Sequence, residues 1–153
     1  MDALEKLIAI SEIKQLRAKY FRGVDSGDGD LVRSILAEDC RLDYRGCCTD
    51  PTSGRDFLPA MNVVVTGRDA WRANGLSGLG IVSVHQGHHS DIDIVSADSA
   101  TGVWAMTDRL YFPEGHEFSL LTGYGHYIDT YIKTALGWQL QTTHITRIKV
   151  EVV

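Results

Sequence analysis

Hydrophobic positions recur at helical spacing in the first part of the chain and at a spacing of two in the second part. Between residues 3 and 22, apolar side chains return every three or four positions with charged residues between them, which predicts a long amphipathic helix. Its apolar stripe is formed by Leu4, Leu7, Ile8, Ile13, Leu16, Tyr20 and Phe21. A turn follows at residues 25–29, and a second helix is predicted over about residues 30–37, with Asp28 as its cap.

The rest of the chain predicts a sheet. A short strand is expected over residues 40–44, and glycines and prolines make residues 46–67 a loop or lid. A short third helix is predicted over residues 66–74, ended by the glycines at 75, 78 and 80. Further strands are predicted over residues 81–89, 91–95, 101–112, 120–133 and 137–152.

Short links between these later strands favour antiparallel hairpins. Helices followed by a twisted antiparallel sheet indicate an α+β fold, in which the curved sheet wraps around the N-terminal helices and forms a cone with a central pocket. With 153 residues and no visible repeat or linker, the chain is expected to form a single domain over residues 1–153.

Asp108 interrupts a strand whose neighbours on the same face are large and apolar. Alternation along residues 101–112 places it between Met106 and Leu110, on the side of Trp104 and Phe112. A buried carboxylate is normally hydrogen-bonded, paired with a cation or protonated, because burying an unpaired charge costs much free energy. We therefore expect Asp108 to have polar partners inside the protein.

His85 lies within a predicted strand and is a candidate general base. Histidine exchanges a proton readily near neutral pH, and a carboxylate beside it fixes its tautomer and stabilises the imidazolium. If the two strands pair, Asp108 supplies that carboxylate. The alternative, a hydrogen-bonded histidine with a purely structural role, stays open on the spacing alone.

The histidines around residue 88 also suggest a metal site. His85, His88, His89, Asp91 and Asp93 are residue types that bind zinc or iron. In a regular strand, however, His85 and His89 lie about 13 Å apart, so a bulge at Gly87 is required before both can reach one ion. We expect no metal.

Three further residues are candidates for the same cavity. Arg147, near the end of the last strand, either turns inward to pair with Asp108 or to hold a substrate oxygen, or turns outward into solvent. Tyr20 and Asp25 flank the end of the first helix, where a wet tyrosine hydroxyl and a turn aspartate are the ordinary alternatives. Four further residues could line the cavity: Ser83, His126, His144 and Cys40.

Charge and cysteine content exclude several classes of function. A formal net charge of −5 and the absence of a basic run argue against a nucleic-acid partner. No apolar run approaches the length of a membrane span, and the N-terminus lacks the pattern of an export signal, so we expect a cytoplasmic protein with no membrane partner. Cys40, Cys47 and Cys48 suggest neither a disulfide framework nor a thiolate zinc site, and reduced thiols are expected.

Taken together, the motifs resemble the SnoaL-like branch of the nuclear-transport-factor-2-like (NTF2-like, cystatin-like) superfamily, nearest the bile-acid 7α-dehydratase and scytalone dehydratase group. The resemblance covers nearly the whole chain. It is carried by Ile13-x-x-Leu16-x-x-x-Tyr20-x-x-x-x-Asp25, Asp28-x-Asp30, His85 with Gly87-His88, Gly102-x-Trp104-x-Met106-x-Asp108, Gly123-x-Gly125-x-Tyr127-x-x-x-Tyr131, Gly137-Trp138 and Thr146-Arg147.

The resemblance implies a catalytic group of Tyr20, Asp25, His85, Asp108 and Arg147. By this resemblance, His85 removes a proton α or vinylogous to a carbonyl and Asp108 supports it. Tyr20 hydrogen-bonds the developing enolate oxygen, Asp25 assists leaving hydroxide, and Arg147 orients the site.

The function implied is a cofactor-independent lyase (dehydratase) or isomerase acting on a small hydrophobic cyclic substrate. Trp104 stands where scytalone dehydratases place a second histidine, so the scytalone reaction itself is not expected. Because one fold serves several functions, two alternatives stay open: a non-catalytic ligand-binding module, and an accessory β-type subunit of a ring-hydroxylating oxygenase. The superfamily also implies a homodimer or homotrimer.

Overall fold

The structure, a computed structural model, describes residues 1–72 and 75–153. The first helix, α1 (Ala3–Ser26), confirms the predicted helix and extends it by about one turn. It begins with a capping box, in which the Asp2 carboxylate accepts from the Glu5 amide at 2.8 Å and the Glu5 carboxylate accepts from the Asp2 amide at 2.7 Å. It ends at Gly27, which adopts the left-handed conformation that glycine takes without strain.

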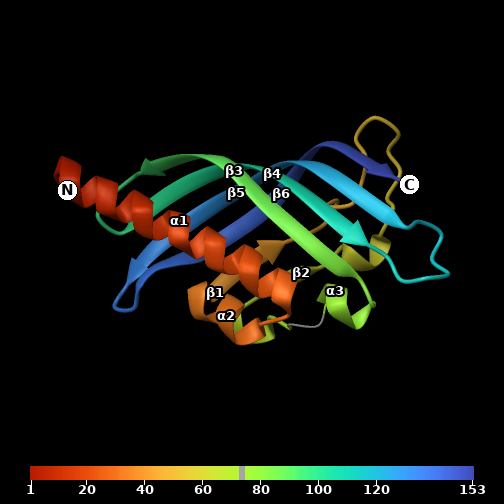
Figure 1. Ribbon diagram of the computed structural model, residues 1–153. Coiled ribbons are helices and arrows are strands. Elements are labelled where there is room, and N and C mark those ends of the chain that lie inside the picture. The colour runs from red at the N-terminus through yellow and green to blue at the C-terminus, as the bar shows by residue number, and fades with distance from the viewer. Residues whose placement is uncertain (73–74) are drawn as a thin grey trace.

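The second helix, α2 (Gly29–Ile35), packs tightly against the end of α1. The Asp28 side chain accepts from the Leu31 amide at 3.0 Å, which confirms the predicted cap. A side chain at Gly23 of α1 would collide with Val32 of α2, so the glycine permits this close approach. Figure 1 shows α1 crossing one face of the sheet, with α2 beside its C-terminal end.

The strands form one six-stranded sheet in the order β2-β1-β6-β5-β4-β3. Their bounds are β1 (Leu36–Asp43), β2 (Val64–Thr66), β3 (Val82–Ile94), β4 (Ser99–Tyr111), β5 (Leu120–Thr134) and β6 (Gly137–Val152). The hairpins from β3 to β6 are antiparallel as predicted, whereas β1 pairs with β6 in parallel. The sheet is therefore mixed but mostly antiparallel, which agrees with the predicted α+β class.

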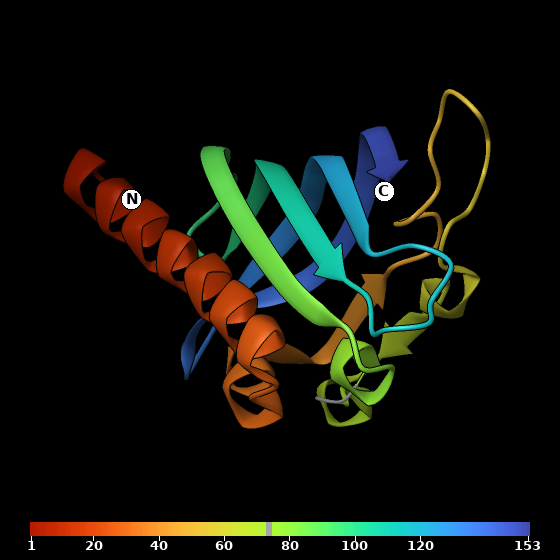
Figure 2. The same ribbon diagram turned by 45° about the vertical axis from the view of Figure 1, so that its right-hand side comes forward.

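The strand β3 is continuous where two separate strands were predicted. Its pairing with β4 shifts between Gly87 and Ser90, so an irregularity replaces the expected break. Gly87 is required at this point because any side chain there would collide with the Phe21 ring of α1. The irregularity thus marks where α1 crosses β3, and Figure 2 shows the two elements side by side.

Residues 3–8, at the start of α1, do not take part in the core. The helix projects beyond the edge of the sheet (Figures 1 and 2), and Leu4, Leu7 and Ile8 are exposed. Their predicted place on the buried stripe was wrong, because all three side chains face solvent. The part of the chain that the structure describes contains no helix long and apolar enough to cross a membrane.

In the described residues, the connection from β1 to β3 contains only short elements of secondary structure. It contains 3-10 helices at Pro59–Met61 and Arg68–Ala70, strand β2, and a single turn of helix, α3 (Gly75–Gly78). Strand β2 was missed in the predicted loop, and a 3-10 turn stands where a third helix was predicted over residues 66–74, of which residues 73–74 lie outside the described part. Two of the three glycines expected to end that helix, Gly75 and Gly78, are the first and last residues of α3 instead.

Candidate active site

A cavity of about 310 Å³ lies between α1, the inner face of the sheet and the connection from β1 to β3. Most of its wall is apolar. Its polar members are Tyr20, Tyr44, Cys47, Cys48, Arg72, His85, Asp108, Tyr127 and Arg147. Small-molecule sites typically combine an apolar wall with a few polar groups in this way.

His85 and Asp25 form a hydrogen-bonded pair at this wall. The Nδ1 atom of His85 lies 2.6 Å from Oδ1 of Asp25, and the His85 amide donates to Oδ2 at 2.8 Å. Ser83 adds a hydroxyl that donates to Oδ1 at 2.9 Å. Asp25 sits in the last turn of α1, so the crossing of α1 over β3 brings together groups 60 residues apart.

This arrangement determines which nitrogen of His85 is free. An ionised carboxylate only accepts hydrogen bonds, so Nδ1 carries the proton and Nε2 keeps its lone pair. Nε2 has no hydrogen-bond partner among the described residues. The His85 side chain is 8% exposed, and its ring stacks on the Phe21 ring with 6.1 Å between the ring centroids. A histidine held in this tautomer beside a cavity can act as a general base.

The predicted pairing of His85 with Asp108 was wrong. The two residues do lie directly opposite each other on β3 and β4, but both oxygens of Asp108 accept from Arg147, each at 2.8 Å. A permanently charged guanidinium binds both carboxylate oxygens at once, which a single imidazole nitrogen cannot do. Gly123 leaves the space for this ion pair, since a side chain there would collide with both partners.

Arg147 turns inward, which settles the two orientations left open by the sequence. Its Nε donates to the carbonyl of Cys47 at 2.5 Å, and Nη1 contacts the sulfur of Met106 at 3.3 Å. Burial alone would lower the pKa of this arginine, but Asp108 outweighs burial and raises it. The ion pair is thus a fixed part of the wall.

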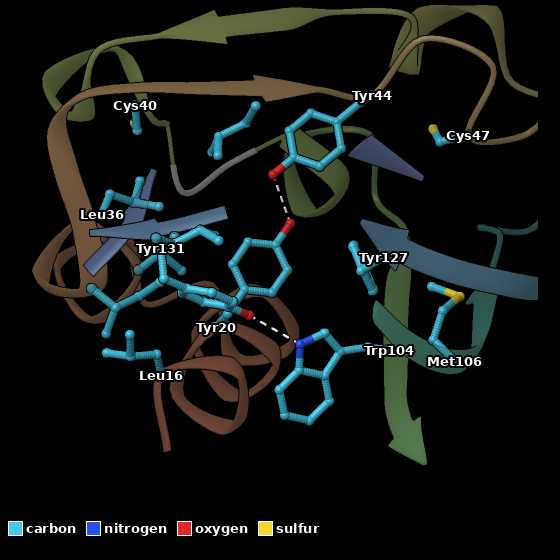
Figure 3. Close-up of a cluster of buried hydrophobic side chains, with 14 of the residues drawn as sticks. Leu16, Tyr20, Leu36, Cys40, Tyr44, Cys47, Trp104, Met106, Tyr127 and Tyr131 are labelled. Atoms are coloured by element: carbon cyan, nitrogen blue, oxygen red, sulfur yellow. Dashed lines mark hydrogen bonds between the residues drawn. The ribbon is translucent and has the colours of Figure 1, made fainter. Parts of the chain in front are cut away.

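Tyr20 meets a second tyrosine that the sequence did not single out. The hydroxyls of Tyr20 and Tyr44 lie 2.6 Å apart, and Figure 3 draws the hydrogen bond between them. Burial raises the pKa of Tyr20 to about 12, against the opposing effects of Arg17 and the bond to Tyr44. Both phenols therefore remain hydrogen-bond donors near neutral pH. The signal for Tyr44 was its alternation with Cys40 and Leu42 on one face of the strand.

A buried ion pair that packs against Tyr20 was also not predicted from the sequence. The Arg17 guanidinium binds the Asp129 carboxylate, and both side chains are fully buried. The same guanidinium lies over the Tyr20 ring at 4.5 Å and the Tyr127 ring at 4.0 Å. The charged group thus packs on the two phenol rings without itself lining the cavity.

The other candidates lie elsewhere. Ser83 supports Asp25, whereas Cys40, His126 and His144 are absent from the cavity wall. His88 points to Thr107, at 2.9 Å between Nε2 and Oγ1. Despite the irregularity near Gly87, no three His, Cys, Asp or Glu side chains of the described residues could hold a metal ion.

The buried phenol of Tyr20 predicts a loss of stability at high pH. The folded chain holds the phenolic proton up to about pH 12, whereas the unfolded chain releases it near pH 10. The stabilisation from this phenol is therefore complete below about pH 10 and is lost as the pH rises through 12, by roughly 3 kcal/mol in all. Urea unfolding of the wild type and of Tyr20→Phe between pH 8 and 12 measures this; equal slopes against pH in the two proteins would contradict it.

Comparisons with known proteins agree with this fold. The family model for the SnoaL-like domain matches residues 5–144. A proposed scytalone dehydratase from Novosphingobium aromaticivorans is 21% identical, with a TM-score of 0.77, covering 99% of this chain and 92% of that one. A type-3 hexachlorocyclohexane dehydrochlorinase from Novosphingobium barchaimii is 16% identical, with a TM-score of 0.75 and coverages of 99% and 94%.

A third similar structure is described by its fold. It is an NTF2-like protein with a cystatin-like fold from Novosphingobium aromaticivorans, 18% identical, with a TM-score of 0.68 and coverages of 95% and 85%. At these identities the solved structures show a shared fold, and the chemistry must be argued from the site.

Proposed function

The chain belongs to the SnoaL-like domain family, and we propose that it is a cofactor-independent lyase or isomerase acting on an uncharged cyclic ketone. The observation that carries the proposal is the His85–Asp25 pair, whose Nε2 is left unpaired at the wall of a mainly apolar cavity. The similar dehydratase and dehydrochlorinase structures are consistent with a lyase.

In the proposed reaction, Nε2 of His85 removes a proton α to the substrate carbonyl. The imidazolium that forms is stabilised by Asp25 at 2.6 Å from Nδ1. It then returns the proton, either to a leaving hydroxyl group, which departs as water, or to another carbon, which completes an isomerisation. A general base of this kind contributes about 10²–10⁴-fold to the rate.

The Tyr20–Tyr44 pair is proposed to bind the carbonyl oxygen. Each phenol has one proton, and the bond between the two hydroxyls uses only one of them. The second proton is available to a ligand oxygen, and it binds an enolate more strongly than a neutral ketone. The pair therefore stabilises the charge that proton removal creates.

Two roles implied by the resemblance change in this proposal. Asp25 supports His85 in place of Asp108, because its oxygens are occupied by the His85 amide, the imidazole and Ser83. It is no longer assigned to the leaving hydroxide. Arg147 and Asp108 neutralise each other and are proposed to shape the wall beside the ligand.

The charges around the cavity predict a preference for uncharged ligands. The Arg147 charge is cancelled by Asp108, Asp25 adds a negative charge, and Arg72 is exposed and bonded to backbone carbonyls. We expect a carboxylate-bearing cyclic ketone to bind at least about tenfold more weakly than its methyl ester, or about 1.4 kcal/mol. Calorimetric titration of both at pH 7 measures this, and tighter binding of the acid would contradict the expectation.

The reaction is tested by incubating the protein with neutral cyclic β-hydroxy ketones and following enone formation by ultraviolet absorbance. Tyr20→Phe and Tyr44→Phe each remove one hydroxyl of the pair and should reduce turnover with little change in ketone affinity. Binding without turnover, or turnover unaffected in both variants, would reject the proposed mechanism. Binding alone would favour the ligand-binding module.

The oxygenase-subunit alternative is less well supported. A subunit with a purely structural role needs no deep pocket around Asp108, whereas in this structure Asp108 lines the cavity. Purification of the full chain from its native host tests this directly, since an accessory subunit would be recovered with a larger partner.

A further inference from the structure

Two adjacent cysteines form part of the cavity wall, and the proposed reaction uses neither thiol. Cys47 and Cys48 are free and buried, and both line the cavity. Their sulfur atoms lie 3.7 Å apart. Both thiols therefore face the same enclosed space as a preformed pair, and Figure 3 draws the first of them at the edge of the buried cluster.

We propose that Cys47 and Cys48 form a binding site for trivalent organoarsenical compounds. A trivalent arsenic atom is pyramidal, so two sulfurs bonded to it at about 2.3 Å lie roughly 3.3–3.8 Å apart for S–As–S angles from about 90° up to the tetrahedral value. The separation of 3.7 Å between the two sulfur atoms falls within this range. The pair can thus bind one thiophilic atom without a change in the backbone.

A disulfide is a poorer use of the same pair. Adjacent Cα atoms lie about 3.8 Å apart across a trans peptide, whereas disulfides usually join Cα atoms about 4.4–6.8 Å apart. All peptide bonds of the described residues are trans. Joining the two sulfurs would therefore strain the backbone, and bridging them through a larger atom would not.

A bare metal ion also fits poorly. Among residues 1–72 and 75–153, no third His, Cys, Asp or Glu side chain completes a metal-binding group. A neutral organoarsenical needs only two thiols and brings its own carbon substituent, for which the apolar wall around Trp71 and Met61 provides a surface.

The chemistry balances without an oxidant or a base. In an arsine oxide, R–As=O, the bonds from arsenic to oxygen break and two arsenic–sulfur bonds form. The oxygen leaves as water with the two thiol protons, and arsenic and sulfur keep their oxidation states. Cys48 begins as a thiol, because the hydrogen bond between its side chain and that of Cys47, together with its burial, raises its pKa.

Titration of the full chain with phenylarsine oxide tests the site. We expect one phenylarsenic group per chain by intact mass, and two fewer reactive thiols in the subsequently denatured protein. A dithiol should remove the group, and excess monothiol should not. Because the folded chain holds the sulfurs in place, it should bind more tightly than the chain unfolded in urea; equal affinities would overturn the proposal.

Single substitutions locate the site. Cys40→Ser is the matched control, because Cys40 is buried outside the cavity wall, and it should leave arsenical binding unchanged. Cys47→Ser and Cys48→Ser should each weaken arsenical binding by about a hundredfold or more, because the one remaining thiol cannot chelate the arsenic atom. Arsenical binding that is unchanged in both Cys47→Ser and Cys48→Ser would overturn the proposed site. If a serine variant fails to fold, the corresponding alanine variant is used, provided that its circular dichroism spectrum is native.

The readout involves no turnover. Its failure therefore leaves the proposed acid–base reaction unaffected, and a failure of that reaction leaves the thiol site intact.

Discussion

Replacing His85 with glutamine is expected to lower turnover by about 10²–10⁴-fold while ligand affinity changes little. Glutamine keeps a polar side chain of similar length but cannot take up a proton at neutral pH. The structure places the unpaired Nε2 at the cavity wall, so the substitution removes the base and leaves most of the wall in place. Steady-state kinetics and calorimetric titration of the same ligand separate the two effects.

Asp25→Asn and Asp108→Asn form a matched pair for the same prediction. Both replace a carboxylate with an amide of the same shape, but only Asp25 touches His85. Asp25→Asn should lose turnover because the amide no longer stabilises the imidazolium. A larger loss of turnover in a folded Asp108→Asn variant than in Asp25→Asn would contradict this assignment and return Asp108 to the role that the sequence suggested.

Asp108→Asn is instead expected to lower the free energy of unfolding by about 3–5 kcal/mol. It leaves the Arg147 guanidinium buried with no compensating charge, and the two side chains are only 4% and 6% exposed. The double variant Asp108→Asn/Arg147→Met removes both charges and should recover part of the loss. Urea unfolding at pH 7 measures all three variants.

An exposed ion pair provides the control for this experiment. Arg55 and Glu117 also lie 2.8 Å apart, but their side chains are 53% and 67% exposed. Glu117→Gln should therefore change the free energy of unfolding by less than about 1 kcal/mol. If Asp108→Asn were as mild as this control, or if the double variant were less stable than either single variant, the account of the buried pair would be wrong.

Period-two alternation identified the inner face of the sheet well. It placed Asp108 among core residues, and the structure shows that carboxylate buried and paired with Arg147. The same reasoning applied to β5 would have found Asp129, which stands between Tyr127 and Tyr131 on the buried face. Alternation thus predicts that a charge is buried, and only the fold shows which cation neutralises it.

The partner of His85 was harder to predict. Strand pairing suggested Asp108, and the register does place the two residues opposite each other. The choice between Asp25 and Asp108 depends on the angle at which α1 crosses β3, which involves contacts between segments far apart in sequence. Helical periodicity likewise could not show that Leu4, Leu7 and Ile8 lie beyond the edge of the sheet.

Exchange of α-hydrogens tests the central claim most directly. A neutral cyclic ketone without a leaving group is incubated with the protein in deuterium oxide, and loss of its α-hydrogens is followed by proton NMR, so that proton removal is observed apart from elimination. We predict exchange well above the buffer rate in the wild type and near the buffer rate in His85→Gln. A ketone that binds in the cavity without faster exchange, or exchange unchanged in His85→Gln, would contradict His85 as the base.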